Sequence, residues 1–293
     1  DVTMLRQPKK AYVVSTSVMD LLQAIDALDD VRLSGTKQED WYIQAAKDAM
    51  ADGDMLYAGK YNQPDYEKII SESCDLAIEN TMILHNPEVK EKLEALGIPV
   101  LVERSSYETH PLGRLEWIRL YGVLFGKEEQ ADAFYQEQVA KVEPIMKKDA
   151  TDQTMAFFYV TSNGSVNVRK PGDYIAKMIQ LAGGSYLPQA VKEDDENALS
   201  TMNMQMEDFY AQAKDADILI YNSTIEGELD SVDTLLAKSP LFADFKAVKE
   251  GKVYCTTADF FQETTGIASF IEDLHAVMTG DTSHELKYLK EVK

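Results

Sequence analysis

A long stretch without glycine, from Lys127 to Lys148, separates two halves of this chain. Glu128 and Glu129 lie near its start, where acidic side chains stabilise a helix, and its one proline, Pro144, comes late. At ~1.5 Å per residue, the stretch predicts a helix of roughly 33 Å, about the width of a small domain. Because a helix resists bending better than a loop, we expect a rigid connection. One face repeats at helical spacing through Ala131, Phe134, Gln138, Val142 and Ile145.

Both halves alternate short apolar runs with stretches of helical spacing. Runs that are apolar almost throughout are typical of parallel strands covered on both faces. The sequence therefore predicts an α/β fold: two α/β lobes with mainly parallel sheets, joined by one long rigid helix, with a ligand cleft between the lobes. The runs occupy residues 11–17, 31–35, 55–59, 74–81 and 98–105 before the helix, and 154–160, 165–169, 218–221 and 252–257 after it.

The predicted domains follow from this pattern. They are an N-terminal α/β lobe at 1–126, the connecting helix at 127–148 and a C-terminal α/β lobe at 149–293. A second helix, predicted at 110–126, is apolar on most of its circumference, so we expect it to be buried. The sequence "TSNG" at 161–164 predicts a hairpin turn.

Composition excludes some classes of function. The formal net charge of −21 argues against a nucleic-acid partner, whose phosphates a protein neutralises with lysine and arginine. No apolar run reaches the ~18 residues that a membrane span needs. The first residues have no apolar signal core, so we expect either an intracellular protein or one whose leader has been removed. Cys74 and Cys255 are interpreted as buried thiols rather than a disulfide, which is compatible with export without demonstrating it.

Several segments, in their order along the chain, resemble the substrate-binding proteins of ABC importers for iron complexes, haem and cobalamin. These class III periplasmic binding proteins have two α/β lobes and a single helical spine. The resemblance covers nearly the whole chain, and the long helix matches the spine in position. The matching segments are "PKKAYVVSTSVMDLLQAI", "GKYNQPDYEKIISESCDLAIENT", "NPEVKEKLEALGIPVLVE", "LAGGSYL", "MEDFYAQAKDADILIY", "FADFKAVKEGKVY" and "TTADFFQETTG".

The resemblance implies two residues that dock onto the membrane permease. In the family, one glutamate on each lobe meets arginines of the permease. Glu207 matches the position on the second lobe, and Glu88 matches the one on the first, with Glu91 as a competitor one turn on. The alternative is an ordinary exposed glutamate near a helix start, stabilised by the helix dipole.

Ligand-binding candidates follow from where the strands end. Open α/β sheets bind ligands at the carboxyl ends of their strands, so the loops there are expected to line the cleft. Thr16 and Asn80 lie in such loops. Trp41, Tyr57 and Tyr61 surround the first-lobe loops, where they can stack on a macrocycle, or a tyrosinate can bind ferric iron. Trp41 lies in a predicted helix, and burial in the core is its alternative.

Basic residues are the second group of candidates. Arg169 and Lys170 form a basic pair in a very acidic chain. Arginine binds carboxylate or phosphate through a planar fork, which suits haem propionates or a carboxylate siderophore. A salt bridge with Asp173 is the alternative for Arg169. Arg104 presents the same choice, with Glu103 as the alternative partner.

Asp259 and Phe260 are the last candidates. They lie in "ADFF", which resembles the stretch through which cobalamin-binding members approach their ligand with an acid and an aromatic residue. The typical aromatic residue there is tryptophan, so phenylalanine departs from the pattern and weakens the cobalamin interpretation. Helix capping and core packing are the alternatives.

Other kinds of site find little support. The 4 histidines are scattered, without the HxxxH or HExxH spacing of a tight metal site. Phosphate-binding, dinucleotide-binding, nucleophile-elbow and CxxC motifs are missing from the sequence. We therefore predict no metal site, no cofactor and no enzymatic activity.

Together these features predict the extracytoplasmic substrate-binding component of an ABC importer. Its expected ligand is an iron complex, either a siderophore or haem, with cobalamin as the alternative tetrapyrrole. Its expected partners are an ABC permease and its ATPase, and we expect a monomer. The resemblance implies a cell-surface lipoprotein or a periplasmic protein whose leader is absent from this sequence. An alternative from a different class is an intracellular two-lobed α/β enzyme, such as a metal chelatase.

Overall fold

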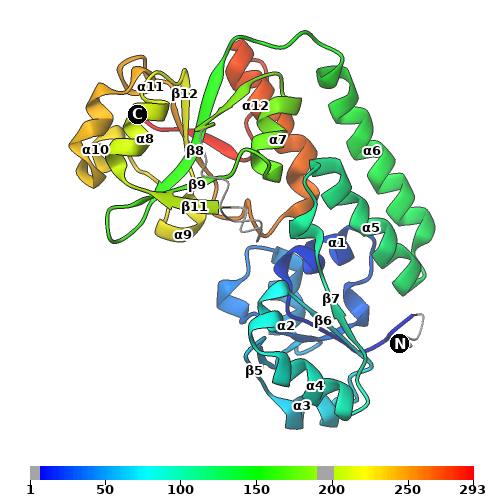
Figure 1. The fold of residues 1–293 in the computed structure, drawn as a ribbon. Helices are drawn as coiled ribbons and strands as arrows, with labels where there is room; N and C mark the ends of the chain where they lie inside the picture. Colours follow the sequence, from blue (N-terminus) through cyan, green and yellow to red (C-terminus); the bar gives the residue numbers. More distant parts are fainter. Residues whose placement is uncertain (1–6, 190–200) are drawn as a thin grey trace. The chain divides into compact units, whose positions relative to one another are not determined.

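The computed structural model describes residues 7–189 and 201–293, and these form two compact units (Figure 1). Each unit has its own α/β sheet, so the predicted two-lobed α/β class is confirmed. The first unit comprises residues 7–106, 113–137 and 261–265. The second comprises residues 107–112, 138–189, 201–260 and 266–293.

The first unit is built on a parallel sheet with the strand order β3-β2-β1-β6-β7. From β1 the chain steps outward through β2 to β3, and it then returns to the other side of β1 with β6. The strand order therefore reverses between β1 and β6. The strands are β1 (Ala11–Val13), β2 (Val31–Ser34), β3 (Leu56–Tyr57), β6 (Leu76–Glu79) and β7 (Val100–Val102).

The helices of this unit follow the predicted alternation, with one difference in extent. The helix predicted around Trp41 begins only at Gln44, because Trp41 follows a short 3₁₀ turn in extended conformation. Asp65 caps α3 by accepting the N–H of Lys68 at 3.0 Å, and Pro87 opens α4. The helices are α1 (Thr16–Ala24), α2 (Gln44–Ala51), α3 (Tyr66–Ser71) and α4 (Pro87–Ala95).

Helices α3 and α4 cover one face of the sheet. Ile69 of α3 and Leu93 of α4 are fully buried in the same cluster as Tyr12 and Ala77, which lie on neighbouring strands. Burying such side chains contributes about 1.5–3 kcal/mol each, so this packing holds the sheet and its loops in place. A small hairpin that the sequence did not predict, β4 (Gly59–Lys60) with β5 (Gln63–Pro64), follows β3.

Two consecutive helices connect the sequences of the two sheets. Helix α5 (Pro111–Phe125) ends at Gly126, whose φ of +70° suits glycine, and α6 (Glu128–Met146) follows (Figure 1). The predicted long helix is confirmed, and the division between the units falls within it, after Glu137. Helix α5 is largely buried, as expected, but Leu120 and Val123 on one face are 42% and 48% exposed.

The second unit has a mixed sheet with the order β11-β9-β8-β12-β13-β14, and β10 pairs with β8. Strands β8, β10, β12 and β13 run parallel to one another. Strand β9 is antiparallel to β8, β11 is antiparallel to β9, and β14 is antiparallel to β13. The predicted hairpin joins β8 to β9 through Gly164, at a φ of +83°. The strands are β8 (Thr154–Val160), β9 (Val166–Arg169), β10 (Ser185–Leu187), β11 (Thr201–Met204), β12 (Ile218–Tyr221), β13 (Val253–Thr256) and β14 (Leu289–Glu291).

The remaining helices pack on this sheet or follow its strands. They are α7 (Tyr174–Leu181), α8 (Met206–Ala213), α9 (Ser223–Glu226), α10 (Val232–Lys238), α11 (Lys246–Lys249) and α12 (Ile267–Thr279). Short 3₁₀ helices complete the described chain: η1 (Leu28–Asp30), η2 (Gln38–Asp40), η3 (Thr81–His85), η4 (Ser105–Tyr107), η5 (Pro240–Asp244) and η6 (Thr264–Gly266).

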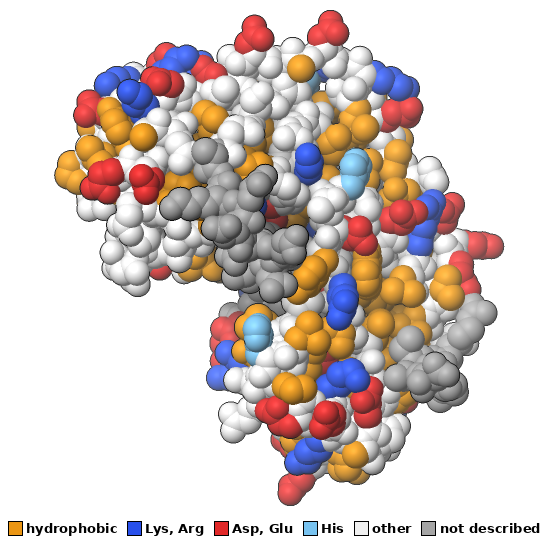
Figure 2. All heavy atoms as spheres, viewed as in Figure 1, with side chains coloured by type: hydrophobic (Ala, Val, Ile, Leu, Met, Phe, Trp, Pro, Cys, Tyr) orange, Lys and Arg blue, Asp and Glu red, His pale blue; other side chains and the backbone are white. Residues whose placement is uncertain are grey.

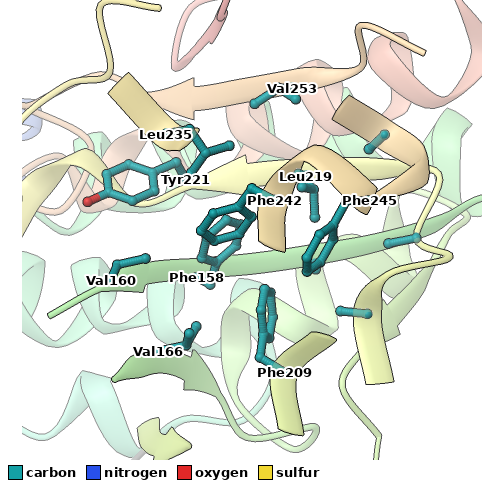
Figure 3. Packing of buried hydrophobic residues seen from close by; sticks show 14 of the residues in the cluster. Phe158, Val160, Val166, Phe209, Leu219, Tyr221, Leu235, Phe242, Phe245 and Val253 are labelled. Carbon is teal, nitrogen blue, oxygen red and sulfur yellow. The ribbon is translucent and has the colours of Figure 1, made fainter. Parts of the chain in front are cut away.

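An aromatic cluster forms the core on one side of this sheet (Figure 3). The ring of Phe158 on β8 lies 4.8 Å from that of Phe209 on α8 and 5.4 Å from that of Phe242 in η5. Phe245 stacks on Phe209 at 5.6 Å. Such ring pairs contribute about 0.5–1.5 kcal/mol beyond the area they bury. The cluster fixes α8 on the sheet, and with it the exposed Glu207 in the first turn of that helix.

A buried carboxylate attaches the end of the chain to the second unit. Asp273 of α12 is 0% exposed and accepts the N–H groups of Tyr288 at 2.6 Å and Leu289 at 3.2 Å. The Nε2 atom of His284 lies 2.7 Å from the same carboxylate. These bonds place β14 at the sheet edge, beside β13. This strand was not predicted from the sequence.

The described residues contain no helix that combines the length and the apolar character needed to cross a bilayer. Figure 2 shows acidic and basic side chains interspersed over the visible face. Although the whole chain has a net charge of −21, the acidic side chains on that face do not form a single acidic patch.

Candidate functional site

A pocket of about 200 Å³ lies within the first unit. Its walls come from residues 14–17 after β1, Asn80 and Thr81 after β6, and Glu103 and Ser106 after β7. Arg114 from α5 and Phe261 complete the lining. All these residues belong to one unit, so the pocket does not depend on how the two units are arranged.

The topology of the sheet explains why the pocket forms at this place. The carboxyl ends of parallel strands meet at one edge, and the loops after β1 and β6 leave in opposite directions because the strand order reverses there. This divergence opens a crevice, which is the usual ligand site of open α/β sheets. The sequence supplies hydroxyl and amide side chains to the crevice in "STS" at 15–17 and "NT" at 80–81.

Ser15 has an unusual role at the start of α1. It is the N-cap residue, yet its side chain makes no capping hydrogen bond to that helix. Instead its Oγ lies 2.9 Å from the Oγ of Ser17 and 3.5 Å from Oε2 of Glu103. Ser15 and Ser17 are only 4% and 8% exposed. The amide groups in the first turn of α1 therefore receive no side-chain acceptor from the position that normally supplies one.

Opposite charges are buried in the same lining. Glu103 is 4% exposed, and its Oε1 accepts the N–H of Ser105. Its side-chain hydrogen bonds go to serines, and among the described residues no cationic side chain forms an ion pair with it. Arg114 is 8% exposed and contributes a guanidinium group. The pocket thus has both a strong acceptor and a strong donor, which suits a polar ligand.

A second buried carboxyl group lies next to the pocket in the chain. Glu79 at the end of β6 is 0% exposed, and neither carboxyl oxygen has a hydrogen-bond partner among the described residues. Loss of hydration raises the pKa of Glu79 to about 8. Burial, and then the proximity of Glu79, raises the pKa values of Tyr12 and Tyr66. The backbone oxygen of Glu79 accepts the N–H of Glu103 at 2.8 Å, which ties this strand end to the pocket wall.

Only some of the first-unit residues predicted to bind the ligand line the pocket. Thr16 and Asn80 line the pocket together, while Arg104 is exposed and lies outside the lining. Tyr57 and Tyr61 are half-buried near β3, and Tyr61 packs against the core cluster. Trp41 is 1% exposed, so burial in the core, its alternative interpretation, describes its position.

The second-unit candidates lie in a separate unit from this pocket. The Arg169 side chain is 12% exposed, with Nη1 3.8 Å from a carboxylate oxygen of Asp173, the alternative partner named from the sequence. Lys170 is half-buried beside it. Phe260 packs its ring 4.2 Å from that of Phe270 in the core, and Asp259 is half-buried. The ligand-binding roles of all the sequence candidates stay predictions.

The loops expected to line the cleft include those that line this pocket, but the candidates named from the sequence omit several of the lining residues. Ser15, Ser17 and Glu103 lie in the loops expected to line the cleft, although Glu103 was considered only as a partner for Arg104. Phe261, rather than its neighbour Phe260, lines the pocket. Arg114 lies on helix α5, and no pattern in the sequence indicates that this helix reaches the strand ends.

A family model described as periplasmic binding protein matches residues 13–260, most of the chain. The chain belongs to the periplasmic binding protein family. The expectation drawn from the resemblance is thereby confirmed. This periplasmic binding protein is 26% and 27% identical, over 268 and 216 residues, to two uncharacterised lipoproteins of Methanocaldococcus jannaschii. The matches cover 86% and 70% of this chain but only 60% and 53% of those relatives.

Solved structures of other binding proteins share the fold. The periplasmic haem-binding protein HutB of Vibrio cholerae has a TM-score of 0.72 at 14% identity, covering 92% of this chain and 99% of that one. The ABC-type Fe³⁺-hydroxamate transport protein of Saccharomonospora viridis has a TM-score of 0.70 at 19% identity, covering 94% and 95%. At sequence identities this low, the structural similarity shows a common fold alone.

The substitution Glu79→Gln tests the buried carboxyl group of this periplasmic binding protein. The folded-state pKa of about 8 lies above the ordinary glutamate pKa of 4.5, so protonated Glu79 contributes stability that is fully present below about pH 4.5. That contribution is lost as the pH rises through about 8. Relative to wild type, the variant should therefore gain about 4 kcal/mol in unfolding free energy between pH 5 and pH 8.

Urea denaturation at pH 5, 6.5 and 8 measures this difference. The control is Glu67→Gln, because Glu67 is an exposed residue of α3. The unfolding free energy of this variant should follow the wild-type pH dependence. Parallel pH dependences for wild type and Glu79→Gln would contradict the raised pKa.

Proposed function

We propose that this protein is the ligand-capturing component of an ABC importer. In this proposal it binds an iron complex, either a siderophore or haem, and delivers the complex to a membrane permease. The observation that carries the proposal is the pocket at the strand-order reversal, which is concave, polar and assembled from three strand-following loops. The family to which the chain belongs supports the same role.

The names of the structural relatives support iron complexes as the ligand class. One is named as a haem-binding protein and another as part of an Fe³⁺-hydroxamate transport system. Our inference extends this ligand class to the present chain. We also place the protein outside the cytoplasm, as a lipoprotein or a periplasmic protein, because two relatives are named lipoproteins. We propose that it acts as a monomer.

Glu88 and Glu207 are the proposed contacts with the permease. Glu88 lies in the first turn of α4 in the first unit, and Glu207 lies in the first turn of α8 in the second. Both side chains are exposed. Each carboxylate stands on a helix that is packed against its own sheet, so each is presented on a firm support. Exposed carboxylates of this kind can pair with permease arginines, with the ATPase acting on the permease.

Titration of the purified protein with candidate ligands tests the proposed function. The panel contains haem, ferric hydroxamate, catecholate and carboxylate siderophores, and cobalamin. Tryptophan fluorescence and absorption spectra report binding. We expect saturable one-to-one binding of one iron complex. Binding of cobalamin alone would overturn the iron proposal, and binding of none of these compounds would overturn the proposed role in their uptake.

Replacing both docking glutamates with lysine tests the proposed contact with the permease. We expect Glu88→Lys with Glu207→Lys to abolish uptake in cells that depend on this importer, because two attractive contacts with arginine become repulsive. Ligand affinity of the purified variant should stay at the wild-type value. A control with the same change in charge replaces Glu67 and Glu285, two exposed glutamates, and should transport normally. Normal uptake by the docking variant would refute the assignment.

A further inference from the structure

The buried charge of Glu103 limits which ligands the first-unit pocket can accept. Glu103 is 4% exposed and has no ion-pair partner among the described residues. A buried carboxylate without a cation is costly, and the cost falls when a ligand supplies a cation or further donors. Its hydrogen bond from Ser15 is long, at 3.5 Å, so Oε2 retains capacity to accept a shorter one.

The serines extend this acceptor surface. The oxygen of Ser17 lies 2.9 Å from that of Ser15, and either hydroxyl can be the donor in this contact. In both arrangements the oxygen of Ser17 keeps a lone pair that can accept from a ligand. The lining therefore offers two acceptors, Glu103 and Ser17.

The lining also contains donors. The Oδ1 atom of Asn80 accepts the N–H of Met82 at 3.0 Å, and this bond fixes the orientation of the amide. The side chain of Asn80 therefore has its NH₂ group to donate. Arg114 adds a guanidinium group, which binds carboxylates through paired hydrogen bonds. The α1 amides left uncapped by Ser15 add positive potential to the pocket.

We propose that this pocket binds a carboxylate that carries a hydrogen-bond donor on the adjoining carbon. The carboxylate contacts Arg114 and Asn80, and the donor, a hydroxyl or an ammonium group, contacts Glu103 and Ser17. A volume of about 200 Å³ admits such a group as the end of a larger ligand. The inference rests on the proposed function, and it selects carboxylate-type chelators of iron over ligands that present only apolar rings.

Three small acids with the same carbon skeleton test the proposal. Malate carries a hydroxyl, aspartate an ammonium group, and succinate neither. Ligand-observed NMR titration at pH 7 measures their dissociation constants with the wild-type protein. We expect malate or aspartate to bind about tenfold more tightly than succinate, because one hydrogen bond to a charged acceptor contributes that much. The tighter of the two identifies the donor as hydroxyl or ammonium.

The substitution Glu103→Gln should reduce this preference to within about twofold, while Glu67→Gln, the exposed control, should retain it. Thermal melting verifies that each variant is folded, and Ser17→Ala replaces Glu103→Gln if the latter does not fold. Equal binding of the three acids to wild type, or binding of none, would overturn the proposal. The titration with iron complexes is independent of this result.

If an iron complex binds but the three small acids bind equally, the proposed function stands and the pocket proposal fails. If the small acids are distinguished but no iron complex binds, the iron-importer role fails and the pocket proposal stands.

Discussion

The reversal of strand order between β1 and β6 is the constraint on which the candidate site depends. All strands of the first sheet are parallel, so their carboxyl ends share one edge, and only at the reversal do the adjoining loops diverge. The crevice is maintained by packing on the sheet face, where Ile69, Val89 and Leu93 hold α3 and α4 against the strands. A pocket formed in this way exists within one unit and is largely preformed.

Burial of polar groups gives the pocket its chemical character. Most buried polar groups in proteins find internal partners, and Asp273 in the second unit is an example, with a full set of backbone donors. Glu103 is different, because its partners are serines and no cation pairs with it among the described residues. Glu79, one strand away, has no hydrogen-bond partner within the described chain at all. Carboxyl groups that the fold leaves incompletely compensated are therefore concentrated near these strand ends, where a ligand can compensate Glu103.

The sequence predicted the architecture well because the alternation of apolar runs and helical stretches is repeated many times. Each buried strand of the first sheet is a short apolar run followed by a helix, so the loops that line the pocket could be named in advance. Short elements were missed, because strands such as β14 (Leu289–Glu291) and the β4–β5 hairpin are too short to show a period. Local propensity also gave way to tertiary packing at Trp41, which is extended and buried although its surroundings favour a helix.

Individual site residues were harder to predict, for a physical reason. Adjacent residues beyond a strand end point in different directions: Glu103 is buried in the pocket and Arg104 is exposed, and no pattern distinguishes them. Phe261 and Arg114 reach the pocket from segments far from β1 in sequence. The most direct test of the account is a crystal structure of the protein with the tightest-binding iron complex. We expect ligand density within hydrogen-bond distance of Glu103 and Arg114. Ligand density that contacts neither residue would contradict it.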